Sequence, residues 1–375
     1  MTNRFFRYFT ETENTGMITA EESKKVEDTA ITDLVEKQKK AGYHVITDGE
    51  FRRATWHLDF MWGFNGVGHS ATENGLPFHD EAAKIDDTFL TGKISVGHHP
   101  FVEHFKFVKA LEDENTAAKQ TIPAPAQFLE QLVMPMNIED TRKIYPNDEE
   151  LIADLVAGYK KVIADLYAAG CRNIQLDDCT WGCFVDPKAR IFFGTDDAGL
   201  EKLQKEFLEI NNLVIEGKPE DLVINTHICR GNFHSTWACT GAYDKVAELV
   251  FGKEQVNALY LEFDDARSGG FECLSHVSDD KKVVITTKFP KLEDKAAAMH
   301  GGCGNFRPFV FLYDIVSSQQ WSPQLLPQKP PPRKTPQPRQ IPLQKHPLWK
   351  RLQPQQTPQK PLPRKTPQPR WTPLQ

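Results

Sequence analysis

The same succession of a capped helix, a glycine and a short strand ending in acidic residues occurs twice in this chain, over residues 19–50 and 147–178. In both units a Thr or Asn stands at the expected start of the helix, apolar side chains recur at helical spacing, and an Ala-Gly pair ends the helix. A helix that leads directly into a short apolar strand is the usual building unit of a parallel sheet. The chain is therefore predicted to alternate helices with parallel strands.

Further elements continue this alternation. Strands are predicted at 221–226, 258–263 and 282–287, and helices at 200–216 and 243–251. Polar residues gather where the strands end, which favours an α/β fold of the (β/α)8 TIM barrel type, with its site at the carboxyl ends of the strands. An open doubly wound sheet would show the same alternation, but the chain lacks the Gly-x-Gly-x-x-Gly fingerprint of that fold.

Residues 64–145 fit the alternation poorly. We interpret them as an insertion or hairpin over the barrel mouth, and residues 121–128 as a loop that follows a strand. His98 and His99 are expected to lie in a solvated part of this segment, in preference to binding a metal.

A His-x-Cys pair, His227 and Cys229, stands where the predicted strand 221–226 ends. Because strand side chains alternate between two faces, both side chains are expected to point the same way. The next predicted strand carries Glu262, and a neighbouring strand would bring this carboxylate to the same rim. His, Cys and Glu all bind zinc, and a catalytic zinc site needs three such ligands and an open position. The alternative is that His227 and Cys229 are ordinary core residues.

Charge and cysteine content restrict the class of protein. The net charge is −6, and the body of the chain is more acidic than this because the C-terminal part is basic, which argues against nucleic acid as a partner. The 7 cysteines are scattered and odd in number, which favours a reducing cytoplasm over a disulfide framework. The sequence contains no apolar run long enough for a membrane helix, so we expect no membrane partner and a cytoplasmic location.

The C-terminal part differs in composition from the rest. Residues 322–375 contain 16 of the 26 prolines and 11 Lys or Arg, and they contain no Asp, Glu or Gly. We predict a barrel domain over residues 1–314 and a disordered tail over 315–375, because such a segment buries too little apolar surface to fold. The tail could bind SH3-like domains as a polyproline II ligand, or it could be non-native sequence with no role.

Five motifs, in this order, resemble the catalytic half of cobalamin-independent methionine synthase, and most closely its single-barrel bacterial relatives. The resemblance covers about residues 17–294, and the motifs are Asp48–Arg53, Ile174–Asp178, His227–Cys229, Leu261–Asp265 and Thr287–Asp294. It implies a (β/α)8 barrel and zinc-dependent transfer of a methyl group from a methylated folate to the thiol of homocysteine.

The resemblance also implies roles for individual residues. His227, Cys229 and Glu262 would bind Zn²⁺ together with a second cysteine from a late strand. Glu50 and Asp177 would hold the amino group of the substrate, and Asp178 and Trp181 would shape the pocket. Judged from the residues alone, the acids could instead cap helices or pair with Arg52 or Arg53, and Trp181 could belong to the core.

The chain departs from the family pattern at both ends. Residues 1–16 do not show the family's first strand with its Gly-Ser loop, and no late Cys-Gly-Phe turn follows residue 295, so a barrel without its first and last elements is expected. Cys303 is a candidate for the late ligand, although it follows Lys288 too closely for a helix and a strand to intervene. A zinc site with three protein ligands would transfer methyl groups slowly or not at all.

Two other functions compete with this one. The first is a decarboxylase of the uroporphyrinogen type, a related barrel that works without zinc. The second is a catalytically inactive barrel whose tail mediates binding.

Overall fold

The computed structural model of the protein describes residues 19–71, 75–77, 82–233, 236–263, 266–286 and 310–311. These residues all belong to the compact unit Met1–Lys334. The predicted tail, 315–375, lies outside the described residues, and so do residues 1–18.

A parallel sheet whose strands follow one another in chain order forms the centre of the fold. Its strands are β7 (Gln120–Pro123), β8 (Asn173–Asp177), β9 (Val223–Ile228), β12 (Ala258–Glu262), β13 (Lys282–Thr286) and β14 (Val310–Phe311). In addition, β1 (Val45–Ile46) pairs in parallel with β6 (Ala117–Ala118), which precedes β7 by one residue. A doubly wound sheet would reverse its strand order at a switch point, whereas this order continues in one direction, as it does around a barrel.

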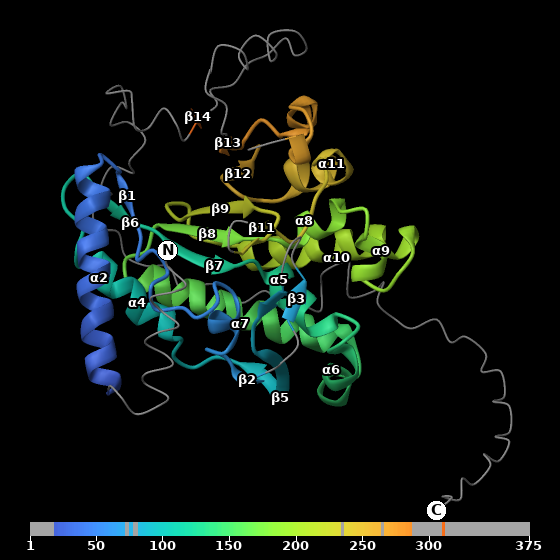
Figure 1. The fold of residues 1–375 in the computed structure, drawn as a ribbon, viewed down its shortest axis with the longest axis horizontal. Helices are drawn as coiled ribbons and strands as arrows, with labels where there is room; N and C mark the ends of the chain where they lie inside the picture. Colours follow the sequence, from blue (N-terminus) through green and yellow to red (C-terminus); the bar gives the residue numbers. More distant parts are fainter. Residues whose placement is uncertain are drawn as a thin grey trace, which may run out of the picture. The chain divides into compact units, whose positions relative to one another are not determined.

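Helices connect the strands, and α10 packs against α5, α7 and α11; Figure 1 shows α7 below β7 in this view. The helices are α2 (Ala20–Lys40), α3 (Leu58–Met61), α4 (Pro100–Lys109), α5 (Pro125–Val133), α6 (Ile138–Ile144), α7 (Asp148–Ala168), α8 (Thr180–Val185), α9 (Ala189–Phe192), α10 (Asp197–Ile215) and α11 (Asp244–Lys253), with short 3₁₀ turns η1 (Ala266–Ser268) and η2 (Glu272–His276). None of the helices in the described residues has the length and apolar character needed to cross a membrane.

The two units recognised in the sequence form as predicted. Thr19 and Glu22 make a reciprocal capping box at the start of α2, and the Asn147 side chain accepts a hydrogen bond from the backbone of Glu150 at the start of α7. Gly42 and Gly170 follow the two helices with φ of 85° and 97°, a conformation that costs glycine little. The predicted strand after α2 is shorter than expected, because only Val45 and Ile46 pair before the chain turns.

The interior between sheet and helices is apolar. Strand side chains such as Ile174, Leu176 and Leu261 are fully buried, and so are Leu155 and Tyr159 of α7. These side chains belong to one continuous core. The core therefore determines the face that each strand turns toward the helices.

The interpretation of residues 64–145 as an insertion was wrong for its second half. Antiparallel pairs do form there, from β2 (Asn65–Ser70) with β5 (Asp87–Ser95) and from β3 (Gly75–Pro77) with β4 (Ala82–Lys84), and a further pair, β10 (Asn232–Phe233) with β11 (Thr236–Trp237), follows later. However, β6 and β7 belong to the parallel strands. Prolines concealed them: Pro123 ends β7, and Pro125 is the first residue of α5, where proline needs no hydrogen-bond partner.

His99 is not in a solvated loop. It is fully buried, its Nδ1 accepts a hydrogen bond from the backbone of Phe101 at the start of α4, and its Nε2 donates one to the carbonyl oxygen of Phe60 at 2.9 Å. Burial lowers the pKa of His99 to about 4. His98, beside it, is exposed as predicted.

Candidate functional site

The register of three neighbouring strands brings the predicted site residues to one end of the sheet. Asp177 of β8 pairs with His227 of β9, and His227 pairs with Tyr260 of β12. Because the strands are parallel, Cys229 and Glu262 follow at nearly the same level, at the carboxyl ends. The structure therefore brings Asp177, His227, Cys229 and Glu262 together.

The His227 ring is held so that one nitrogen faces Glu262. Its Nδ1 donates a hydrogen bond to the Tyr260 carbonyl oxygen at 3.3 Å, and its Nε2 lies 3.7 Å from Oε1 of Glu262. This arrangement is typical of a metal-binding histidine, whose second nitrogen is fixed by a backbone or carboxylate acceptor. Among the described residues, however, no three His, Cys, Asp or Glu side chains already have the mutual spacing of a metal site.

Cys229 lies beside a second thiol that the sequence analysis missed. Its Sγ is 2.7 Å from Sγ of Cys179, and it accepts a hydrogen bond from the backbone N–H of Gly231 at 3.3 Å. The bond with Cys179 and the neighbouring His227 hold the pKa of Cys229 well below its usual value. Cys179 directly follows the acids of β8, and that position was the signal available in the sequence.

The acidic groups and the histidine of the site shift one another's pKa. Burial alone would lower the pKa of His227, but Cys229, Asp177 and Glu262 together raise it to about 9. Burial raises the pKa of Asp177 to about 6, with Glu50 adding to the shift and His227 opposing it. The site thus concentrates negative charge, which suits a cation.

Glu50 approaches Asp177 from the turn after β1. Its φ is 61°, the one positive φ of a non-glycine residue among the described residues. Backbone strain of this kind occurs often at functional sites. Its Oε1 accepts hydrogen bonds from Oγ1 of Thr121 at 2.8 Å and from Nη1 of Arg53 at 3.1 Å. The predicted pairing with Arg53 is therefore present, and 34% of the Glu50 side chain remains exposed.

Lys119 is a second residue that the sequence analysis missed, because it lies in the segment interpreted as an insertion. Its Nζ donates to Oε1 of Gln175 at 2.7 Å, and Nε2 of Gln175 donates to Oδ1 of Asp177 at 2.6 Å. Burial lowers the pKa of Lys119, whereas Asp177 and Glu50 raise it. Lys119 thus supplies a positive charge close to both carboxylates.

Asp178 and Trp181 occupy the core behind the site. Asp178 is fully buried and accepts hydrogen bonds from the Thr180 backbone at 3.1 Å and from Nδ2 of Asn211 at 2.9 Å. Trp181 is fully buried against Phe184. Both side chains therefore support the residues that face the site, as the core interpretation of Trp181 anticipated.

Tyr243 joins the ends of β9 and β12. Its hydroxyl donates to the Ile228 carbonyl oxygen at 3.0 Å and accepts from the Glu262 N–H at 3.1 Å and from Nη1 of Arg230 at 2.9 Å. Gly182 of α8 approaches the same region so closely that a Cβ there would lie 2.5 Å from the Cys229 carbonyl oxygen. The backbone carrying Cys229 and Glu262 is therefore fixed from two sides.

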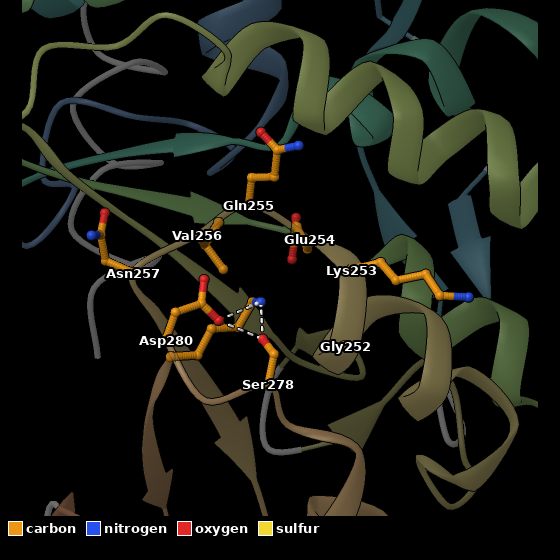
Figure 2. A pocket seen from close by; sticks show the side chains of 9 residues that line it. Gly252, Lys253, Glu254, Gln255, Val256, Asn257, Ser278 and Asp280 are labelled. Atoms are coloured by element: carbon orange, nitrogen blue, oxygen red, sulfur yellow. Dashed lines mark hydrogen bonds and ion pairs between the residues drawn. The ribbon is translucent and has the colours of Figure 1, made fainter.

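A surface cavity of about 520 Å³ lies at the opposite, amino ends of β12 and β13, and Figure 2 shows Gln255, Asn257 and Asp280 around it. Glu254 lines it and is linked to the back of the site: Nδ2 of Asn211 donates both to Asp178 and, at 3.0 Å, to Oε1 of Glu254. Burial and then Asp178 raise the pKa of Glu254 to about 8. The cavity is thus separate from the cysteine and histidine residues.

Cys303, the candidate late ligand, lies outside the described residues, as does the motif Thr287–Asp294. The structure therefore places three of the four predicted metal ligands, together with Glu50, Asp177, Asp178 and Trp181.

No protein-family model matches the chain. Two uncharacterized proteins of Bacillus subtilis (strain 168), YxjH and YxjG, are 38% identical over 283 residues and 39% identical over 284 residues, and each match covers 74% of this chain and 73% of the relative. A solved structure described as "Putative Vitamin-B12 Independent Methionine Synthase", from Listeria monocytogenes, is 31% identical, with a TM-score of 0.60 over 79% of this chain and 82% of that chain.

A B12-independent methionine synthase from Shewanella sp. W3-18-1, solved in complex with selenomethionine, is 18% identical, with a TM-score of 0.50 over 72% of each chain. At this identity the likeness concerns the fold alone. Together with the strand order, these structures confirm the predicted barrel class.

Proposed function

The chain belongs to the cobalamin-independent methionine synthase family, and on that premise we propose that it is a zinc-dependent methyltransferase that makes methionine from homocysteine. The methyl group would come from a methylated folate. Methyl transfer in general is the activity of the family, while zinc, homocysteine and the folate are the specific parts of this proposal.

The observation that carries the proposal is the meeting of His227, Cys229 and Glu262 at the ends of two adjacent strands. A nitrogen, a thiolate and a carboxylate form a donor set that zinc accepts, and the Tyr260 carbonyl already orients the histidine. Zinc, when bound there, lowers the pKa of the homocysteine thiol and so supplies the nucleophilic thiolate.

The remaining polar residues would bind the rest of the amino acid. Asp177 and Glu50 are two carboxylates that can accept hydrogen bonds from the ammonium group of homocysteine, and Gln175, Thr121 and Arg53 fix their positions. Lys119 limits the repulsion between the two carboxylates. The thiol and the ammonium group would thus be held at separate points, which orients the sulfur toward the methyl donor.

The decarboxylase alternative has no use for a His-Cys-Glu set at the ends of two adjacent strands, and no observation favours it. The binding role of the tail concerns residues that the structure does not describe.

The test is methionine formation by the full-length chain loaded with zinc, with homocysteine and methyltetrahydrofolate with or without a polyglutamate tail, measured by mass spectrometry. We expect methionine from the wild type and none from Cys229→Ala, while the control Cys273→Ala, outside the site, stays active. No methionine from any methylated folate, or full activity in Cys229→Ala, would contradict the proposal.

A further inference from the structure

Building on this proposed function, we propose that Cys179 is a fourth protein ligand of the zinc ion, in the role that the family pattern gives to a late cysteine. The inference concerns a residue that the motifs do not include. It stands on the position of Cys179 between the end of β8 and the start of α8, and on its contact with Cys229.

The two thiols meet just beyond the carboxyl ends of β8 and β9. Asp177, the last residue of β8, pairs with His227, and Cys179 at the start of α8 brings its Sγ to 2.7 Å from Sγ of Cys229. Leu261 of β12 pairs with Ile228, which brings Glu262 to the level of Cys229. The ends of three neighbouring strands thus bring two sulfurs, one nitrogen and one carboxylate to the same edge of the sheet, where the described side chains must still move closer together to share one metal ion.

The contact between the thiols differs from that of an ordinary pair of core cysteines. The Sγ atoms of Cys179 and Cys229 are 2.7 Å apart, and both residues are partly exposed. The other close pair, Cys183 and Cys239, is buried, with 3.4 Å between its Sγ atoms. Of the two pairs, the first is the one next to His227 and Glu262. Its two thiols therefore have further metal-binding side chains beside them, and their partial exposure gives them access to solvent.

A zinc ion between the two sulfurs requires a small movement. With Zn–S bonds of about 2.3 Å in a tetrahedron, the sulfurs would be about 3.8 Å apart, so they must separate by about 1 Å from their present distance of 2.7 Å. Both residues are partly exposed, and rotation of either side chain would provide this separation.

The second thiolate changes the chemistry of the site. With His227 neutral, the ligands Cys229 and Glu262 balance the charge of Zn²⁺, and the Cys179 thiolate makes the complex negative. With four protein ligands in place, the substrate sulfur would have to enter as a fifth ligand, an expansion that catalytic zinc sites allow. A more electron-rich metal would withdraw less charge from that sulfur and so keep it nucleophilic. The slow turnover expected for three protein ligands would then not apply.

The test uses Co²⁺ as a spectroscopic substitute for zinc in the full-length chain under reducing conditions. The intensity of the sulfur-to-cobalt charge-transfer absorption per bound ion reports the number of thiolate ligands. We expect Cys179→Ala and Cys179→Ser each to halve this intensity and to weaken zinc binding, measured by chelator competition, on the order of 100-fold, since even outer partners of a ligand contribute 10- to 100-fold. The matched control Cys183→Ala should keep the wild-type spectrum.

The outcomes separate this inference from the proposed function. If the wild type binds cobalt and Cys229→Ala abolishes binding, but both Cys179 variants keep the full intensity, Cys179 is not a ligand and the zinc site itself stands. An equal loss in Cys183→Ala would assign the second sulfur to the buried pair and would overturn the inference as well. A wild type that binds neither cobalt nor zinc, or a Cys229→Ala variant with an unchanged spectrum, would overturn both.

Discussion

Nδ1 of His227 donates a hydrogen bond to the backbone carbonyl oxygen of Tyr260, across the boundary between two parallel strands. The bond ties the orientation of the imidazole to the strand pairing itself, because Tyr260 is the residue paired with His227 in the sheet. Nε2 is consequently turned toward Glu262. The candidate metal site thus takes its geometry from the backbone of the barrel.

Replacing His227 by Ala should remove this nitrogen without unfolding the chain, since the side chain is 24% exposed. We expect zinc affinity to fall on the order of 100-fold or more, because a direct ligand contributes at least as much as an outer partner. Zinc retained after dialysis against a chelator would be measured by mass spectrometry. The control is His98→Ala at an exposed histidine, and equal zinc in both variants would remove His227 from the site.

Asp177→Asn should weaken homocysteine binding while zinc stays bound. The substitution removes the charge that would hold the substrate ammonium group, and a hydrogen bond to a charged group contributes about 1.5–3 kcal/mol, which is tenfold or more in affinity. Calorimetric titration of the zinc-loaded protein with homocysteine checks this. Asp87→Asn, at an exposed position, is the control, and unchanged affinity in Asp177→Asn would leave this carboxylate a structural role only.

Asn211→Leu should destabilise the protein strongly. The amide of Asn211 donates to Asp178 and Glu254, and its oxygen accepts from the Ala126 N–H at 2.9 Å, so the change leaves several buried polar groups without this partner. A cost of about 3 kcal/mol or more follows from 1–3 kcal/mol per unsatisfied group. Urea unfolding measures it, with Lys205→Leu at an exposed position of the same helix as the control. Similar stability of the two variants would show that water replaces the amide.

Glu254 should make folding stability fall as pH rises. Its pKa of about 8 in the folded protein exceeds the ordinary value of 4.5, so between these values the folded state holds a proton that the unfolded state has released. Relative to Glu254→Gln, the wild type should therefore lose on the order of 3 kcal/mol of unfolding free energy between pH 5.5 and 8.5.

Urea unfolding of both proteins at the two pH values gives this difference directly. The matched control is Glu248→Gln, a side chain that is 79% exposed. A wild type and a Glu254→Gln variant with the same change between the two pH values would show that Glu254 is ionised when buried.

Much of this arrangement could be predicted because it depends on local patterns. Helical spacing and caps located α2 and α7, and alternation along a strand indicated that His227 and Cys229 share a face. Proline concealed β7, since a strand ending in Pro123 and a helix beginning at Pro125 look like a loop when the neighbouring strand is unknown.

The contacts that could not be predicted join residues far apart in the chain. Cys179 meets Cys229 only through the register of β8 and β9, and Asn211 meets Glu254 only through packing of α10 beside the start of β12. No spacing in the sequence encodes such pairings. They follow from tertiary structure, and in the case of Cys179 they add a donor that the motifs do not name.

Anomalous X-ray diffraction at the zinc absorption edge, from crystals of the zinc-loaded chain, tests the central claim most directly. We predict one strong peak at about 2.0–2.3 Å from Nε2 of His227, Sγ of Cys229 and the carboxylate of Glu262. A crystal with no zinc peak, or with its zinc peak away from these three side chains, would contradict the proposed site.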